Sequence, residues 1–106
     1  MTTKFETLTI QQFADMVMDE YDAMTNLLRS KRESYGPSNL TRFGTLGILI
    51  RASDKVERLS TLLQSGETTS ADGDSIEDAW KDLLGYATLA LVYMRCQDVE
   101  WEEVQS

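Results

Sequence analysis

Apolar residues recur at helical spacing in three long segments of the chain, and this periodicity limits the fold more than any other feature. The first segment opens with a capping-box pattern, Thr9 followed by Gln12 three residues later, and runs to about Ser34. The second covers about 46–65, and the third starts near 74–78, where two overlapping acidic capping patterns occur. Because strand-like alternation is weak throughout, we expect an all-α fold with three long helices.

Two breaks separate the helical segments. The first, Tyr35 to Asn39, contains a glycine that permits a left-handed helix end and a proline that prevents simple continuation. The second, 66–73, is rich in Thr, Ser and Asp and is typical of a loop. The last ten residues are acidic, and we expect most of this short C-terminal segment to be solvated. A chain of 106 residues arranged in this way predicts one domain over 1–106.

Charge and composition limit the partners, the location and the metal sites that can be expected. The chain has 18 acidic and 10 basic residues, a formal charge of -8, so it lacks the broad basic surface that duplex nucleic acid requires. No apolar run approaches the ~18 residues of a membrane helix, so we expect no membrane partner. The single cysteine, Cys96, has no internal disulfide partner, which favours the cytoplasm. The chain has no histidine, which excludes zinc sites of the usual Cys/His type.

The third segment is apolar on nearly every side. From Leu83 to Met94, only Gly85 and Thr88 are not large apolar, aromatic or alanine residues. A helix at the surface of a three-helix monomer would show a polar stripe instead. Two interpretations remain: a central helix with a wide face turned to the other two, or a homodimer or larger homo-oligomer that buries the surplus. We expect self-association to complete the helical bundle.

Four carboxylates form two pairs at helical spacing, Asp54 with Glu57 and Asp78 with Asp82. Side chains three or four residues apart share a helical face, with Cβ atoms about 5 to 6 Å apart, and carboxylate oxygens suit Mg²⁺. Asp54 can instead form an ion pair with Arg58, and Asp78 can face the helix N-terminus. Asp82 lies at the edge of the apolar run, where a charge needs a partner. The sequence therefore predicts a metal site that depends most on Asp82.

Basic residues stand close to these acids and around the first break. They are Arg51, Lys55 and Arg58 in the second segment, and Lys31, Arg32 and Arg42 beside the break. Such side chains either bind phosphate oxygens, for which Arg offers two donors at once, or serve as ordinary solubilising charges. Tyr35 and Asn39 in the break either contact a nucleotide base or are turn residues.

Several short motifs follow one another in a fixed order: Tyr35-Gly36-Pro37-Ser38-Asn39, Arg42-Phe43-Gly44, Gly47-Ile48, Arg51-x-x-Asp54-Lys55-x-x-Arg58-Leu59 and Ile76-Glu77-Asp78-x-x-x-Asp82-Leu83-x-x-Tyr86-Ala87. This series resembles the nucleotide modification associated domain 1 family, a small domain common in phages. More distantly, the chain is similar to the MazG-type all-α nucleoside triphosphate pyrophosphohydrolases, which bind Mg²⁺ through an ExxE and an ExxD motif on successive helices. The present chain has DxxE and DxxxD at those places.

The resemblance implies a Mg²⁺-dependent enzyme that cleaves a (deoxy)nucleoside triphosphate to monophosphate and pyrophosphate. The metal ligands would be Asp54, Glu57, Asp78 and Asp82, with Glu57 and Asp82 as the catalytic residues and Glu57 orienting or deprotonating the attacking water. Phosphates would be bound by Arg51, Lys55 and Arg58, and the base by Tyr35 and Asn39. The altered spacing of the acids supports an alternative, a non-catalytic module that binds or sequesters a nucleotide in phage nucleotide metabolism or modification. A helical scaffold without a small ligand is the third possibility.

Overall fold

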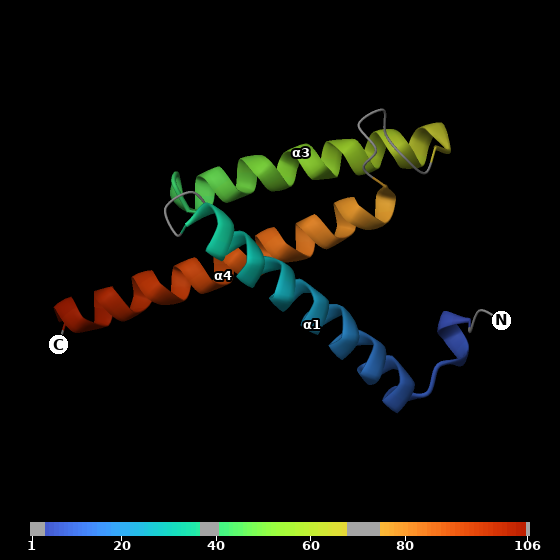
Figure 1. Ribbon diagram of the computed structural model, residues 1–106, viewed down its shortest axis with the longest axis horizontal. Coiled ribbons are helices and arrows are strands. Elements are labelled where there is room, and N and C mark those ends of the chain that lie inside the picture. Colours follow the sequence, from blue (N-terminus) through green and yellow to red (C-terminus); the bar gives the residue numbers. More distant parts are fainter. Residues whose placement is uncertain (1–3, 37–40, 68–74, 106) are drawn as a thin grey trace.

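The computed structural model describes residues 4–36, 41–67 and 75–105, and these confirm the predicted all-α class. A single 3₁₀ turn, η1 (Phe5–Thr7), precedes the helices. The three long helices are α1 (Ile10–Tyr35), α3 (Gly44–Ser65) and α4 (Ile76–Gln105) (Figure 1). The acidic C-terminal segment, predicted as a solvated tail, continues α4 as far as Gln105.

The ends of the helices follow the local sequence signals. At the start of α1, the backbone N–H of Gln12 donates to the Thr9 hydroxyl at 3.0 Å, and the N–H of Thr9 donates to the Gln12 side chain at 2.9 Å, which confirms the predicted capping box. The helix ends at Gly36, whose φ of 78° favours glycine, and α3 ends in the same way at Gly66, with φ 76°. The other residues of the first break, 37–39, lie outside the described residues.

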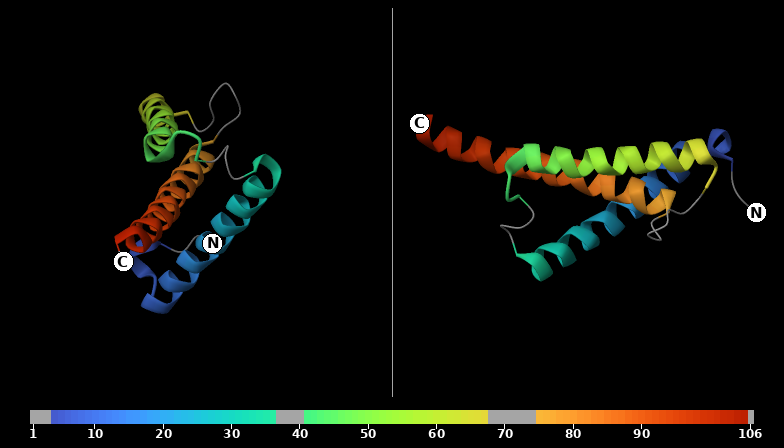
Figure 2. Two further views of the ribbon diagram at one scale, coloured as in Figure 1. Left: turned by 90° about the vertical axis from the view of Figure 1, so that its left-hand side faces the viewer. Right: turned by 90° about the horizontal axis from the view of Figure 1, so that it is seen from above.

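The helix α4 lies between the other two. It runs antiparallel to α3, and these two helices stay side by side along much of their length, whereas α1 crosses α4 on another side and its N-terminal half diverges (Figures 1 and 2). At the crossing, Gly85 of α4 faces Leu28 of α1. This crossing leaves an opening between α1, the start of α3 and the middle of α4.

The core of a single chain is small. Among the described residues, the buried apolar side chains are Met24, Ile48, Leu59, Leu62 and Ala79. The radius of gyration is 17.0 Å, against about 13 Å for a compact domain of this length. The chain is therefore more extended than a monomer with a fully formed core.

Substitution by alanine is expected to change the free energy of unfolding in opposite directions at two helical glycines. A Cβ added at Gly85 would lie 3.6 Å from Leu28 Cδ2, an ordinary contact, whereas a Cβ added at Gly47 would lie 2.7 Å from Phe43 Cβ. Gly85→Ala should raise the free energy of unfolding by about 0.5 to 1 kcal/mol, because alanine favours the helix. Gly47→Ala should lower it, because the turn that carries Phe43 must shift. Urea denaturation of both variants measures this, and destabilisation by Gly85→Ala would contradict the packing at the crossing.

Candidate functional site: a basic pocket

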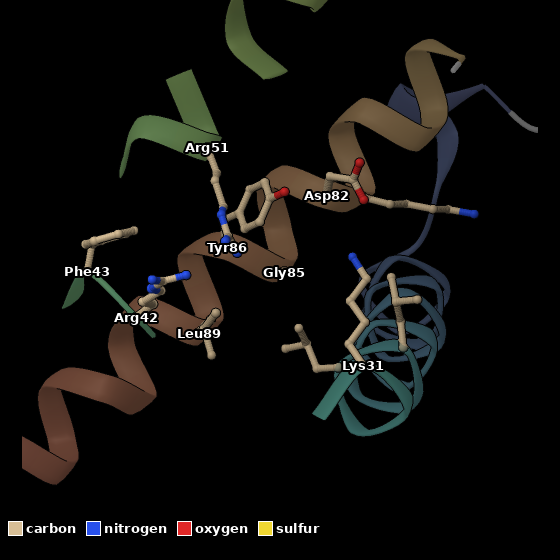
Figure 3. Close-up of a pocket in the computed structure, with 11 residues that line it drawn as sticks. Lys31, Arg42, Phe43, Arg51, Asp82, Gly85, Tyr86 and Leu89 are labelled. Carbon is tan, nitrogen blue, oxygen red and sulfur yellow. The ribbon is translucent and has the colours of Figure 1, made fainter. Parts of the chain in front are cut away.

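A pocket of about 410 Å³ opens where α1, the turn before α3 and the middle of α4 meet (Figure 3). Basic side chains from four places in the chain line it: Lys31, Arg42, Arg51 and Lys81. Among the described residues, Asp82 supplies the one carboxylate of the lining. The rest of the wall is apolar or aromatic and consists of Leu27, Leu28, Phe43, Gly85, Tyr86 and Leu89.

Each part of the pocket is placed by local structure. Lys31 lies one turn beyond Leu27 and Leu28, on the face of α1 that meets α4, and its side chain extends toward the stretch of α4 that carries Asp82 and Gly85 (Figure 3). Gly85 contributes no side chain, so the space beside it stays open. Arg51 reaches from α3 toward Tyr86 (Figure 3). The pocket therefore combines side chains that are far apart in the sequence.

The turn before α3 positions Arg42, another basic side chain of the pocket. Gly44 takes a φ of 62°, a left-handed conformation that favours glycine, and its N–H donates to the carbonyl of Thr41 at 2.9 Å. This turn places Arg42 and Phe43 at the pocket, with the guanidinium carbon of Arg42 5.3 Å from the centre of the Phe43 ring. A guanidinium at that distance is attracted to the face of the ring. Arg42 and Phe43 therefore form one edge of the pocket together.

The pocket is positive although the chain as a whole is strongly negative. Lys55, which lies outside the lining, places its ammonium 3.0 Å from the carboxylate of Asp82 and offsets the one negative charge there. Lys81 lies 3.1 Å from Glu77, and the hydrogen bond to Glu77 raises the pKa of Lys81. Among the described residues, no ion pair engages Lys31 or Arg51. Their charges are directed at the pocket, which suits an anionic ligand.

The four predicted metal ligands do not come together in one chain. Asp54 and Glu57 are exposed on α3, Asp78 caps the start of α4, and Asp82 is paired with Lys55. In the parts of the chain that the structure describes, no group of three or more acidic or cysteine side chains is arranged to hold a metal ion. As they lie in one chain, the four carboxylates do not fit the predicted Mg²⁺ site, which stays a prediction.

Asp78 takes the capping role that the sequence left open. Its N–H donates to the Ser75 hydroxyl at 3.0 Å, and its carboxylate accepts from the N–H of Ser75 at 3.3 Å. These hydrogen bonds with Ser75 lower the pKa of Asp78 below the usual 3.8. Since the folded pKa is the lower one, the cap stabilises the fold at neutral pH, and its contribution is lost as the pH falls through the folded pKa.

Of the three residues predicted to bind phosphate, one lies at the pocket and two lie outside its lining. Arg51 lines the pocket, whereas Lys55 and Arg58 do not, and Lys55 bridges to α4 instead. Lys31 and Arg42, further candidates that the sequence offered beside the first break, join Arg51 at the pocket.

The side chains predicted to bind the base lie outside the described residues. Tyr35 ends α1, but its side chain lies outside the described residues, as does Asn39. The structure offers two other rings at the pocket, Phe43 and Tyr86, which sequence reasoning did not single out as base-binding. Tyr86 could have been found from the sequence, because it lies four residues after Asp82 and so shares its helical face.

Neither a family model, nor a curated protein, nor a solved structure matches this chain. The resemblance to the nucleotide modification associated domain 1 family and to the MazG-type enzymes therefore stays a prediction from the motifs. Among the described residues, no helix combines the length and apolar character needed to cross a membrane.

Proposed function

We propose that the chain binds a nucleotide through its phosphates in the basic pocket. The observation that carries this proposal is the convergence of Lys31, Arg42 and Arg51, from α1, the following turn and α3, in a chain of net charge -8. Ammonium and guanidinium groups form charge-assisted hydrogen bonds with phosphate oxygens, and a guanidinium can engage two at once. Three such groups at one pocket match the charge of a di- or triphosphate.

The remaining wall suits the base and sugar. Phe43 and Tyr86 offer aromatic rings, and Leu27, Leu28 and Leu89 offer apolar contact. A volume of about 410 Å³ falls within the range of about 300 to 1,000 Å³ that small-molecule pockets occupy. Inorganic phosphate would use only the cations, so the apolar and aromatic part of the lining supports an organic phosphate.

A second candidate is the pyrophosphohydrolase that the motifs predict. It is favoured by Asp82, a carboxylate in the wall of the same pocket, beside the cations that would bind phosphates. Glu57 and the other predicted metal ligands would have to approach Asp82 to hold Mg²⁺ there. Their separation in one chain gives more support to binding without turnover. Either function would suit a cytoplasmic protein, because nucleotides are available in the cytoplasm.

Isothermal titration calorimetry tests the proposal. A nucleoside triphosphate should bind more tightly than both its parent nucleoside and inorganic tripolyphosphate, because only the nucleotide uses both parts of the pocket. Binding should weaken as the salt concentration rises, because salt screens the attraction between exposed charges. Absence of binding for every triphosphate, with and without Mg²⁺, would contradict the proposal. Release of pyrophosphate in the presence of Mg²⁺ would favour the second candidate.

A further inference from the structure

A single chain exposes far more surface than a compact protein of its mass. Its solvent-accessible area is 8494 Å², whereas a folded monomer of 12.0 kDa exposes about 6,000 Å². The difference is about 2,500 Å², as much as one subunit buries in a large obligate dimer. An excess of this size is large enough to supply one side of a stable dimer interface.

The exposed apolar side chains on α3 and α4 are regularly spaced. On α3 they include Leu46, Leu49, Val56 and Leu63, and on α4 they include Trp80, Leu84, Leu91 and Met94. Steps of three, four or seven residues keep side chains on one stripe of a helix, as in the contact seam of a coiled coil. We call these eight residues, with the groove between them, the α3–α4 face.

A groove of about 710 Å³ lies between α3 and α4, and Leu46, Leu49 and Met94 of the two stripes are among the residues that line it. Its lining includes the small side chains of Ala52, Ala87 and Ala90 and the larger ones of Leu49 and Met94. None of the described residues that line the groove is charged. It is therefore shaped and apolar enough to receive the side chains of another helix.

The α3–α4 face points away from α1. α1 crosses α4 at Gly85, and residues two and five positions further on, such as Ala87 and Ala90, project well round the helix from that crossing. Nothing else in the described part of the chain packs over the groove, because α1 and α3 are the helices that pack on α4. In Figure 2 the outer side of the α3–α4 pair is accordingly free of other helices.

We infer that a second copy of this chain packs on the α3–α4 face, so that two antiparallel helix pairs form a four-helix bundle. The area supports this occupant, because obligate dimers bury about 2,000 Å² or more in total through interfaces that resemble a protein core. The absence of charge in the groove also matters, since two copies that each carry a charge of -8 can meet there without opposing carboxylates. A two-fold arrangement lets each copy cover the face of the other.

The test is the mass of the full chain in solution, by sedimentation equilibrium at micromolar concentration. The wild type should have twice the chain mass of 12.0 kDa. Leu49→Glu places a charge in the groove and should raise the dimer dissociation constant by at least about 100-fold. Ile50→Glu is the matched control: Ile50 is 57% exposed, close to the 62% of Leu49, but lies outside the groove. It should leave the dimer intact.

The melting temperature of the wild type gives a second readout, which remains useful if Leu49→Glu fails to fold. For a dimer that melts to unfolded chains, the melting temperature rises with protein concentration. A monomeric wild type, or a melting temperature independent of concentration, would overturn the inference. So would a dimer that survives Leu49→Glu, or one that Ile50→Glu disrupts to the same extent. None of these outcomes depends on whether the basic pocket binds a nucleotide.

Discussion

Replacing Arg51 with glutamate should weaken the binding of a nucleoside triphosphate by about 10- to 100-fold, because a hydrogen bond to a charged group contributes about 1.5 to 3 kcal/mol. Arg51 lines the pocket together with Lys31 and Arg42. The substitution removes one phosphate donor and adds a negative charge beside the ligand. Calorimetric titration of the variant against the wild type measures the loss.

Arg95→Glu is the control for net charge. Arg95 is exposed on α4 and does not line the pocket, so its replacement makes the same change in total charge away from the ligand. Its affinity for the triphosphate should stay within about twofold of the wild type in buffer of physiological ionic strength, because distant exposed charges are screened. An equal loss for both variants would mean that general electrostatics, and not the pocket, determines binding.

The second large effect is expected at the ion pair that joins α3 to α4. Lys55 and Asp82 lie 3.0 Å apart, and their side chains are only 20% and 23% exposed. Lys55→Glu would set two partly buried carboxylates against each other and should lower the free energy of unfolding by about 2 kcal/mol. In a domain of this size that corresponds to a fall of about 10 °C in the melting temperature.

Exchanging the charges of Lys55 and Asp82 tests whether the loss of stability comes from the ion pair itself. The double variant Lys55→Asp, Asp82→Lys restores one charge of each sign and should recover part of the lost melting temperature. Lys81→Met, which breaks the more exposed pair between Lys81 and Glu77, should change the melting temperature much less. A double variant no more stable than Lys55→Glu would show that Lys55 and Asp82 do not stabilise each other.

The helices could be predicted because their signals are local. The capping box of Thr9 and Gln12, the glycine at the end of α1 and the pairing of Ser75 with Asp78 each depend on residues within four positions of one another. Apolar periodicity supplied the rest. For the acidic C-terminal segment the sequence predicted only a solvated tail, and it did not predict that α4 continues through it.

The site could be predicted only in part. That Asp82 needs a cationic partner follows from its place beside the apolar run, and the structure supplies Lys55. The sequence cannot tell which residue of α3 faces α4, since Asp54 and Lys55 are neighbours but lie about 100° apart around the helix. Lys55 turns toward α4, and Asp54 stays exposed.

The pocket itself depends on tertiary geometry. Lys31, Arg42 and Arg51 were all recognisable as candidate phosphate-binding residues, but their meeting depends on the crossing of α1 and α4 at Gly85 and on the turn at Gly44. No spacing in the sequence encodes the angle of that crossing. The three cations could be recognised from the sequence as candidates among six basic residues, but their convergence could not.

A crystal structure of the chain with a non-hydrolysable nucleoside triphosphate and Mg²⁺ would show directly where the phosphates bind. We expect phosphate oxygens within hydrogen-bonding distance of Lys31, Arg42 and Arg51, with the base against Phe43 or Tyr86. Phosphates held through Mg²⁺ at Asp54 and Glu57, with the basic pocket empty, would contradict this expectation.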